Sequence, residues 1–527
     1  MSGRRDFIKR ALGISALFLA EPIAHPVEKL LGKTENRTIH AGDKIFGTVT
    51  ANGKPIPGVA VSDGATVTVT AADGSYSLAP APNARFIYIS NPAGYATATN
   101  EYGIARFYRT IPGREEPEEN ENDGENGNNP DDGTNPNNGN KKTGEAKLFD
   151  TPVDFELKPS GDDTVHSFFF LADPQMLDQE DVGRFRDETL PDIMMMAEDR
   201  KNLFCITAGD IVFSKPELFE EYQKVLKRTK LPFYQVVGNH DTDHAAQTNE
   251  NSVKSYERYF GPDYYSFNKG KIHYVVLNDV FWFGDYMGYL EQKQLDWLKA
   301  DLALVEKGST VVVFAHIPPY NTDHIRHNKP EPDKILVVTN RDALYELLKP
   351  FKTYFITGHM HESEYIEDNG FEIHVVGAVC GAWWTENICW DGTPNGYGMY
   401  EVNGSELKWK YKSTGRPHTY QLALYKKGSI KNRPDEVVAN VWGWDKYGKV
   451  NWYEDGEAKG EMTRITGKDP QAVNLFEGKN KPEKHPWVEP VVTNHLFVAK
   501  PSAEAKMVVV EFVNRFGDRF VQRLRME

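Results

Sequence analysis

The stretch Pro232-Phe233-Tyr234-Gln235-Val236-Val237-Gly238-Asn239-His240-Asp241 decides the fold of this chain. An apolar run suited to a buried strand ends at Gly238, and three polar residues follow it at once. Loops at the ends of such strands lie at the rim of a core, where a substrate can reach their side chains. The stretch therefore predicts a strand that delivers Asn239, His240 and Asp241 to a functional site.

Four other apolar runs end in the same way, each at residues that can bind a metal ion. They are 167–172 with Asp173 and Gln175, 203–209 with Asp210, 310–315 with His316, and 353–358 with His359 and His361. Helical patterns alternate with these runs at 218–226, 295–305 and 342–348. Alternating strands and helices form an α/β layer whose site lies at the carboxyl ends of the strands. We therefore expect one α/β domain over residues 165–412.

The chain has 527 residues, which is too long for one ordinary domain and indicates about two to four. Hydrophobic residues make up 39% of it, which supports packed cores and argues against global disorder. The formal charge of −15 disfavours a general binder of nucleic-acid backbones. Much of that charge is local, because residues 114–145 hold ten acidic and three basic residues. The remainder is only mildly acidic, so charge does not identify the substrate.

Residues 1–25 predict an export signal. Arg4 and Arg5 precede an apolar segment over 11–20 that is too short to span a bilayer. The paired arginines followed by Phe7-Ile8-Lys9 resemble the twin-arginine signal of bacteria. We expect a periplasmic protein without a transmembrane helix.

Residues 43–160 predict an amino-terminal β-sandwich. Short strands and Gly-containing turns over 43–112 resemble the small sandwich appended to carboxypeptidases and many bacterial surface proteins. The pattern contains no clustered ligands, which favours a spacer or packing role over ligand binding. Residues 113–146 hold nine asparagines and no Val, Ile, Leu or aromatic residue, so this acidic segment is expected to be flexible. Residues 153–157 alternate like a strand, which makes the segment an insertion into the sandwich.

Helical periodicity fades after residue 412, and residues 413–527 predict a second mostly β domain. Only three cysteines occur. Cys205 lies inside an apolar run and is expected to be a buried thiol. Cys380 and Cys389 either pair in an oxidising compartment or stay free.

Each strand-end motif alone is weak evidence, but the five in order are specific. They resemble the calcineurin-like metallophosphoesterase superfamily over residues 165–412, about half of the chain. The flanking modules resemble domains attached to a bacterial branch of that family. The resemblance implies a four-layer α-β-β-α core flanked by two mostly β, sandwich-like domains. It also implies hydrolysis of phosphoric esters.

Mixed imidazole and carboxylate ligands suit Zn, Fe or Mn rather than Ca. Two such ions roughly 3.5–4 Å apart can share a bridging hydroxide and hold the attacking and leaving oxygens of phosphoryl transfer. The resemblance assigns the bridging carboxylate to Asp210. It places Asp173 and His361 on the first ion, and Asn239, His316 and His359 on the second.

The resemblance makes His240 the phosphate contact and general acid, since an imidazole has a pKa near neutrality. Asp241 is expected to orient it. One departure from the family concerns Gln175, which stands where an Asp-x-His motif usually has histidine. Its amide oxygen is a neutral, poorer ligand, so the first ion is expected to be weaker, more oxygen-bound or a different element. We expect Gln175 to remain a ligand; the alternative is a degenerate site that no longer holds two ions.

Two further groups are candidates for substrate contact. The stretch 380–384 with 390–397 is rich in tryptophan and glycine, and either walls a pocket for a sugar, base or lipid headgroup or packs between domains. His324 and His327 lie in the loop that follows 317–319, where solvated histidines are the commoner case.

The sequence thus predicts an exported two-metal hydrolase of phosphoric monoesters or diesters. Its partner would be a phosphorylated small molecule or an envelope phospholipid or phosphopolymer; no nucleic-acid-binding module is indicated, and the oligomeric state is left open. The alternative is a cell-envelope binding protein whose core has weakened catalysis. A metal hydrolase of another bond should show a different ligand order, such as His-Glu-x-x-His, which does not occur in the chain.

Overall fold

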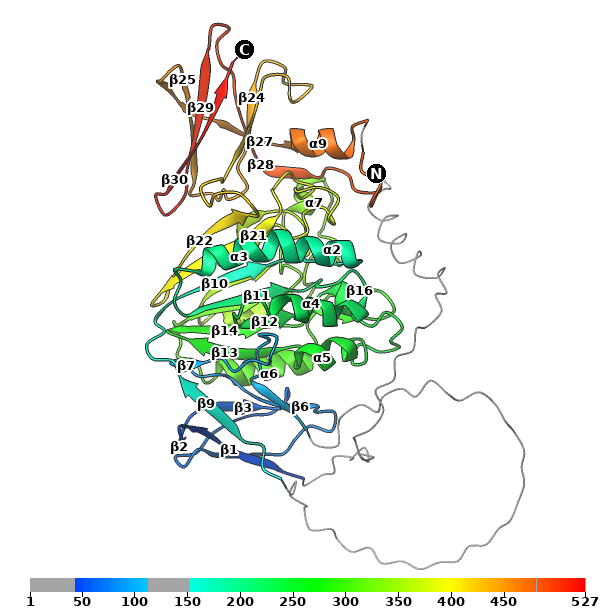
Figure 1. The fold of residues 1–527 in the computed structure, drawn as a ribbon, viewed down its shortest axis with the longest axis vertical. Helices are drawn as coiled ribbons and strands as arrows, with labels where there is room; N and C mark the ends of the chain where they lie inside the picture. The colour runs from blue at the N-terminus through cyan, green and yellow to red at the C-terminus, as the bar shows by residue number, and fades with distance from the viewer. Residues whose placement is uncertain (1–42, 112–150, 480, 527) are drawn as a thin grey trace, which may run out of the picture.

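The computed structural model describes residues 43–111, 151–479 and 481–526. The expected signal peptide (1–25) and acidic insertion (113–146) lie outside these residues. Figure 1 shows three parts stacked along the long axis: an amino-terminal β unit, a central α/β core and a carboxy-terminal β unit. Among the described helices, none combines the length and the apolar character that crossing a membrane requires.

Two mixed sheets form the core. The first has the order β12-β11-β10-β21-β22, with parallel pairing of β10, β11 and β12. Its strands are β10 (Val165–Leu171), β11 (Leu203–Ala208), β12 (Phe233–Val236), β21 (Gly396–Asn403) and β22 (Glu406–Ser413). The second has the order β13-β14-β17-β18-β20-β19. Its strands are β13 (Tyr265–Lys269), β14 (Ile272–Val276), β17 (Thr310–Phe314), β18 (Lys352–Thr357), β19 (Glu364–Asp368) and β20 (Phe371–Val375).

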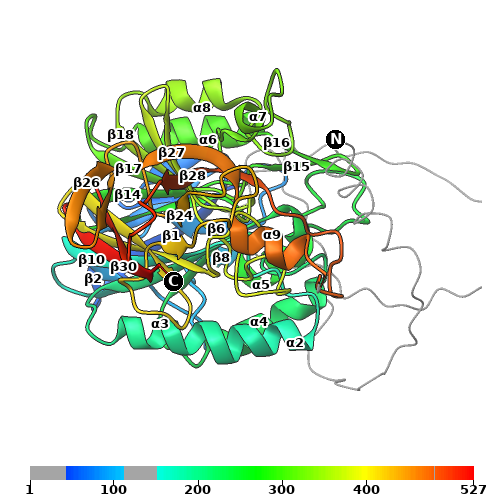
Figure 2. The same cartoon turned by 90° about the horizontal axis from the view of Figure 1, so that it is seen from above.

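Helices cover the outer faces of both sheets, as Figure 2 shows from above. The first sheet carries α2 (Gln179–Arg184), α3 (Leu190–Ala197), α4 (Phe219–Leu226) and α5 (Lys254–Phe260), and the second carries α6 (Gln292–Leu302) and α8 (Arg341–Leu348). Aromatic side chains fill the space between the sheets: the Phe168 ring lies 4.5 Å from that of Tyr400 and 5.4 Å from that of Phe314, centroid to centroid. The expected α-β-β-α core is confirmed.

The central strands are continuous apolar runs because both of their faces are buried. All five residues of β17 and all six of β11 are buried. Helix starts are set locally: the Asp178 carboxylate accepts the N–H groups of Glu180 and Asp181 at the first turn of α2. The polar residues of the five motifs therefore lie in the loops that follow these strands.

The amino-terminal unit consists of two small sheets. One contains β1 (Ile45–Ala51), β2 (Lys54–Pro55), β5 (Ser75–Leu78), β7 (Tyr95–Ala96) and β9 (Phe155–Pro159), and the other contains β3 (Ala60–Ser62), β4 (Val67–Val69), β6 (Phe86–Ile89) and β8 (Tyr108–Thr110). Strand β9 pairs in parallel with β1, with Val49 opposite Phe155. Chain from both sides of residues 112–150 therefore joins the same unit.

The carboxy-terminal unit packs two four-stranded sheets against each other. Their strands are β23 (Ala423–Tyr425), β24 (Val437–Asn440), β27 (Thr463–Lys468) and β28 (Val492–Ala499), and β25 (Lys449–Glu454), β26 (Glu457–Glu461), β29 (Met507–Val513) and β30 (Arg519–Arg525). A short helix, α9 (Pro470–Phe476), interrupts the strands and was not expected from periodicity. Asp469 caps it and Pro470 begins it, which is a sequence signal for a helix start.

Candidate metal centre

The candidate site lies at the carboxyl ends of five core strands. Asp173 follows β10, Asp210 follows β11, Asn239 and His240 follow β12, His316 follows β17, and His359 and His361 follow β18. Because β10, β11 and β12 are parallel in one sheet and β17 and β18 are parallel in the other, these ends meet at one edge of the core.

Six of the predicted ligands lie close together at this edge: Asp173, Asp210, Asn239, His316, His359 and His361. His316 Nε2 lies 3.4 Å from Asp210 Oδ1, 3.2 Å from Asn239 Oδ1 and 3.1 Å from His359 Nδ1. Asp173 Oδ1 lies 4.0 Å from His316 Nδ1 and 3.7 Å from His361 Nε2. One ligand atom each from Asp210, His316 and His359 fall within 4.8 Å of one another, which is compact enough to hold an ion.

Each of the three histidines has one ring nitrogen bonded to a main-chain carbonyl. The pairs are His316 Nδ1 with Ala208 O at 2.9 Å, His359 Nε2 with Ile335 O at 2.8 Å, and His361 Nδ1 with Gly381 O at 2.8 Å. A carbonyl only accepts, so each of these nitrogens donates its proton, and the other ring nitrogen is the one that a metal ion could bind. Bonds of this kind fix the orientation of metal-binding imidazoles.

The charges of the site favour a cation. The Asp173 and Asp210 carboxylates are buried, and they accept the main-chain N–H groups of His359 at 2.9 Å and of His240 at 2.8 Å. Burial disfavours a charged imidazole, but Asp210 and Asp173 outweigh burial and raise the pKa of His316 to about 10. A cluster that makes a buried imidazole this basic also attracts a metal ion.

Gln175 is buried beside Asp210 and is bonded to it through both its side chain and its main chain. Its Nε2 donates to Asp210 Oδ2 at 2.8 Å, and its main-chain N–H donates to the Asp210 carbonyl at 2.7 Å. Its Oε1 is buried and has no hydrogen-bond partner in the structure. A buried carbonyl oxygen without a donor is costly unless a cation satisfies it. The donor set therefore fits metal ions, and Gln175 stays a predicted ligand.

Five of these residues have backbones in the left-handed region: φ is 49° at Asp173, 41° at Gln175, 47° at Asp210, 70° at His359 and 50° at His361. Such conformations each cost on the order of 1–3 kcal/mol in non-glycine residues and persist where the surrounding fold dictates them. The strain is concentrated in the loops that present the ligands. The surrounding fold therefore imposes the backbone conformation of these five residues.

Glycines before the ligands allow the strands to approach closely. A Cβ atom at Gly358 would lie 2.7 Å from Asp173 Oδ2, and one at Gly238 would overlap the Asp210 main chain. Gly238, which ends the apolar run of β12, is therefore required by its packing against the predicted ligand Asp210.

His240 is half-buried beside the centre. Burial lowers its pKa to about 4, so the ring is neutral at physiological pH. The contact to its Nδ1 comes from Ser214 Oγ at 2.8 Å. The Asp241 carboxylate, expected to orient this ring, instead accepts the N–H groups of Gly238 at 2.9 Å and Val212 at 3.2 Å. Asp241 holds the turn, and the orienting contact belongs to Ser214, which no sequence motif marks.

The tryptophans after β20 brace the ligand loops. Trp383 stacks on the His361 ring at 4.0 Å, Trp384 Nε1 donates to the Pro174 carbonyl and Trp390 Nε1 donates to the Met360 carbonyl, both at 2.8 Å. All three are buried, which favours the packing role over an open pocket wall. Cys380 and Cys389, in the same stretch, are buried and free. His327 bonds to Asp323, and His324 lies against Tyr320.

The carboxy-terminal unit contributes to the rim of the site. The Phe213 ring lies 4.5 Å from that of His240 and 5.7 Å from that of His485, and the Trp487 ring lies 4.6 Å from that of Trp383. Phe213, His485 and Trp487 are half-buried.

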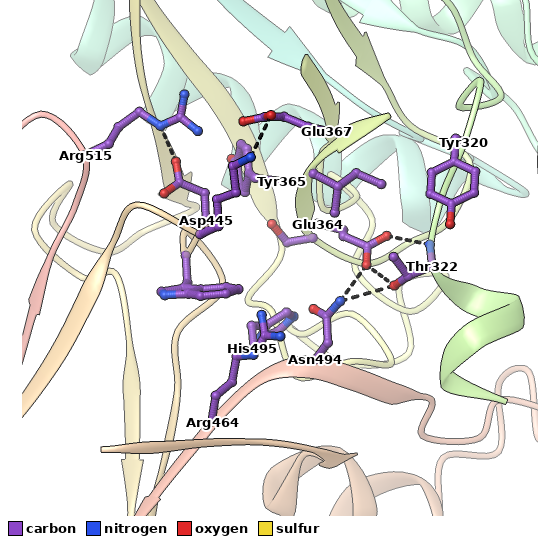
Figure 3. A pocket seen from close by; sticks show the side chains of 14 residues that line it. Tyr320, Thr322, Glu364, Tyr365, Glu367, Asp445, Arg464, Asn494, His495 and Arg515 are labelled. Carbon is purple, nitrogen blue, oxygen red and sulfur yellow. Dashed lines mark hydrogen bonds and ion pairs between the residues drawn. The ribbon is translucent and has the colours of Figure 1, made fainter. Parts of the chain in front are cut away.

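A separate cavity of about 260 Å³ lies where β19 meets the carboxy-terminal unit. Figure 3 shows its polar side chains bonded to one another: Glu364 accepts from Asn494 at 2.7 Å and from the Thr322 N–H at 3.1 Å, and Asp445 pairs with Arg515. No predicted metal ligand lines it. The cavity marks the domain junction and not the metal centre.

Three family models match the chain in succession. They are described as the N terminal of calcineurin-like phosphoesterase (residues 43–123), calcineurin-like phosphoesterase (166–363) and the C terminal of calcineurin-like phosphoesterase (373–520). Together they cover most of the described residues, and the central model contains all the predicted ligands.

Curated relatives match shorter stretches. Serine/threonine-protein phosphatase CPPED1 of Mus musculus is 32% identical over 129 residues, 22% of this chain and 41% of that protein. Purple acid phosphatase 15 of Arabidopsis thaliana is 29% identical over 149 residues, 26% of this chain and 25% of that protein. A probable cyclic nucleotide phosphodiesterase of Psychrobacter arcticus is 22% identical over 220 residues, 40% of this chain and 74% of that protein. The chain thus spans less than half of the length of the two phosphatases.

Among solved structures, purple acid phosphatase PPD1 from yellow lupin (Lupinus luteus) matches 47% of this chain and 51% of its own, with 14% identity and a TM-score of 0.36. GAP50 of Plasmodium matches 47% of this chain and 84% of its own, with 14% identity and a TM-score of 0.33.

Proposed function

Because the chain belongs to the calcineurin-like phosphoesterase family, we propose that it is a metal-dependent hydrolase of phosphoric esters. The convergence of carboxylates and imidazoles at the strand ends carries the proposal. The names of the relatives agree with it, since they are phosphatases and a phosphodiesterase. They include both ester classes, so monoesters and diesters are both candidate substrates.

We propose that the site holds two ions, Mn, Zn or Fe. Asp210 lies between two groups of donors, with Gln175 against its Oδ2 and His316 near its Oδ1, and would bridge the ions. Asp173, His361 and Gln175 would hold one ion, and Asn239, His316 and His359 the other. When bound, such ions activate a water molecule as nucleophile and neutralise charge on the phosphoryl oxygens.

His240, which lies beside the predicted ligands, would contact the phosphoryl group. Its Nδ1 is occupied by Ser214, so Nε2 is the nitrogen that can hold a proton near the leaving oxygen. The half-buried aromatic rim of Phe213 and Trp487 would exclude part of the surrounding water.

The test uses protein freed of metal by chelation and reloaded separately with Mn²⁺, Zn²⁺, Fe²⁺ or Mg²⁺. Turnover of p-nitrophenyl phosphate, bis-p-nitrophenyl phosphate and pyrophosphate is then measured. We expect metal-dependent turnover of at least one ester and its loss in Asp210→Asn and His359→Ala. Wild-type turnover in either variant would refute the site. Tight metal binding without turnover of any ester would favour a binding protein on a phosphoesterase core.

We also propose export through the amino-terminal signal, with a phosphorylated small molecule or an envelope phospholipid or phosphopolymer as substrate. The support is the twin-arginine pattern at Arg4 and Arg5. Replacing both with lysine should keep the protein in the cytoplasmic fraction of a bacterial host that has the export machinery. An unchanged periplasmic fraction would contradict this.

A further inference from the structure

Ser214 contacts His240 through both its side chain and its main chain. Its Oγ lies 2.8 Å from His240 Nδ1, and its N–H donates to the His240 carbonyl at 3.1 Å. Its φ is 56°, a left-handed conformation that serine rarely adopts. The loop after β11 thus holds an unfavourable backbone at the position where the hydroxyl meets the imidazole.

His244 continues this contact on the far side of Ser214. Its Nε2 lies 3.4 Å from Ser214 Oγ and 3.4 Å from the Asn239 carbonyl oxygen. Trp282, at the end of β15 (Val280–Trp282), stacks on the His244 ring at 5.0 Å with 17° between the planes. Trp282 Nε1 donates to the Ala246 carbonyl at 2.9 Å, which fixes the indole. The ring of His244 is therefore held from two sides.

The direction of the hydrogen bonds follows from which groups can donate. The Asn239 carbonyl only accepts, so His244 Nε2 carries a proton. That N–H also points to Ser214 Oγ, which accepts it. The single hydrogen of the Ser214 hydroxyl is then left for His240 Nδ1. A neutral imidazole that accepts at Nδ1 carries its own proton on Nε2.

We propose that Ser214, oriented by His244, is a positioning residue that places the ring proton of His240 on Nε2. This inference rests on the proposed function, because the Nε2–H group would donate a hydrogen bond to the leaving oxygen of a phosphoric ester while its proton stays on nitrogen. Ser214 takes the role for which Asp241 was expected. Neither Ser214 nor His244 would touch the reacting atoms. They would set the tautomer of His240, which does.

The first test does not depend on turnover. Protein labelled with ¹⁵N in its histidines and loaded with Zn²⁺ is studied by NMR, and the His240 signals are identified by their loss in His240→Asn. We expect a protonated Nε2 and an unprotonated Nδ1 in the wild type, and a mixture of the two tautomers in Ser214→Gly. Glycine tolerates the left-handed φ, so this variant removes the hydroxyl without adding strain. A proton on Nδ1 in the wild type would overturn the proposal.

The second test compares the p-nitrophenyl ester with the phenyl ester of the class that the wild type hydrolyses. A hydrogen bond to the leaving oxygen matters more for the more basic leaving group, so Ser214→Gly should lower kcat for the phenyl ester about tenfold more than for the p-nitrophenyl ester. His244→Phe, which keeps a ring against Trp282 but has no N–H, should shift this ratio in the same direction. Adding Ser214→Gly to His240→Asn should not shift it further.

Lys215→Ala is the matched control, because Lys215 is the next residue and pairs with Glu217 at 3.6 Å. It should leave the ratio of the two esters unchanged. Equal losses on both esters in Ser214→Gly would show a merely structural role and refute the proposal. If the wild type hydrolyses no phosphoric ester, the proposed function fails, and the NMR experiment still decides the tautomer of His240.

Discussion

The metal centre and the junction between the core and the carboxy-terminal unit both bury acidic side chains, but they compensate the charge differently. At the junction, Glu362 accepts two bonds from Arg326, at 2.6 and 2.8 Å, and both side chains are 4% exposed. At the metal centre, the neighbours of Asp173 and Asp210 are amides and imidazoles. In the described part of the chain, no lysine or arginine pairs with either carboxylate.

The two regions therefore differ in where the positive charge comes from. Burial disfavours the charge of Arg326, yet Glu362 raises its pKa above the ordinary value, and arginine stays charged at any physiological pH. At the junction, the charge of Glu362 is therefore compensated within the folded chain. At the metal centre the corresponding group is His316, which can release its proton when an ion arrives. The difference separates a structural ion pair from a site built for an external cation.

Asp210→Asn should break the metal centre with the largest effect. Turnover should fall by about 10³-fold or more, equivalent to ~4 kcal/mol of barrier, because the negative charge proposed to bridge the ions would be lost. Addition of metal should no longer raise the melting temperature as it does in the wild type. Steady-state kinetics and calorimetry with and without chelator measure both effects. Metal-free wild type and variant should melt within roughly 4 °C of each other, and a larger loss of stability would show that Asp210 is part of a structural network.

Arg326→Met should break the junction and spare the metal centre. Removing one partner of a buried ion pair typically costs about 3–5 kcal/mol of unfolding free energy, because the other charge is left uncompensated. Denaturant unfolding measures this, and metal content per folded molecule should stay at the wild-type level. The double variant Arg326→Met/Glu362→Leu should recover much of the stability. An unchanged midpoint in the single variant would contradict the comparison.

Gln175→Ala should weaken the metal centre by a smaller amount. We expect an about 10- to 100-fold loss of affinity for one of the two ions, with turnover reduced in parallel, because a neutral ligand oxygen is removed. Metal titration monitored by calorimetry resolves the two steps. Gln175→His should bind that ion more tightly than the wild type, since imidazole is the better ligand. Equal metal content and turnover in Gln175→Ala would exclude Gln175 from the site.

Trp383→Phe should have the smallest effect. The smaller ring still packs on His361 but covers less of it, so we expect a severalfold loss of metal affinity, at or below the about 10-fold end of effects seen for residues that support ligands. Competition with a metal indicator measures it. Trp409→Phe is the control, because Trp409 packs against His374 in the core, and no predicted ligand is among its ring contacts. If both variants lost affinity equally, the brace on His361 would have no special role.

The strand-end residues could be predicted because their signal is local. An apolar run and a metal-binding residue follow one another within a few positions, with a glycine between them at Gly209, Gly238 and Gly358, and parallel strands bring such ends together. The core architecture follows from the same pattern. Gln175 could be marked as unusual from its position alone, but its bond to Asp210 depends on two loops that are 35 residues apart.

What the sequence did not reveal depends on contacts between distant loops. Ser214 is one serine in a loop, and its partner His240 lies 26 residues away. Asp241 was assigned to the neighbouring imidazole because the two are adjacent in sequence, whereas its carboxylate bonds to the main chain of Gly238 and Val212. The domain boundaries and the roles of the individual ligands stay predictions.

The three imidazoles predicted as ligands are anchored by the carbonyls of Ala208, Ile335 and Gly381. These acceptors belong to the polypeptide backbone, so no side-chain replacement at those positions can delete them. Ile335 can therefore change over generations while the orientation of the His359 ring is inherited, provided that the loop path is kept. Gly381 is more restricted, because its φ is 58° and a Cβ atom there would lie 2.7 Å from the Ile388 carbonyl oxygen. Mutational scans that read importance from side chains alone would overlook this layer of support.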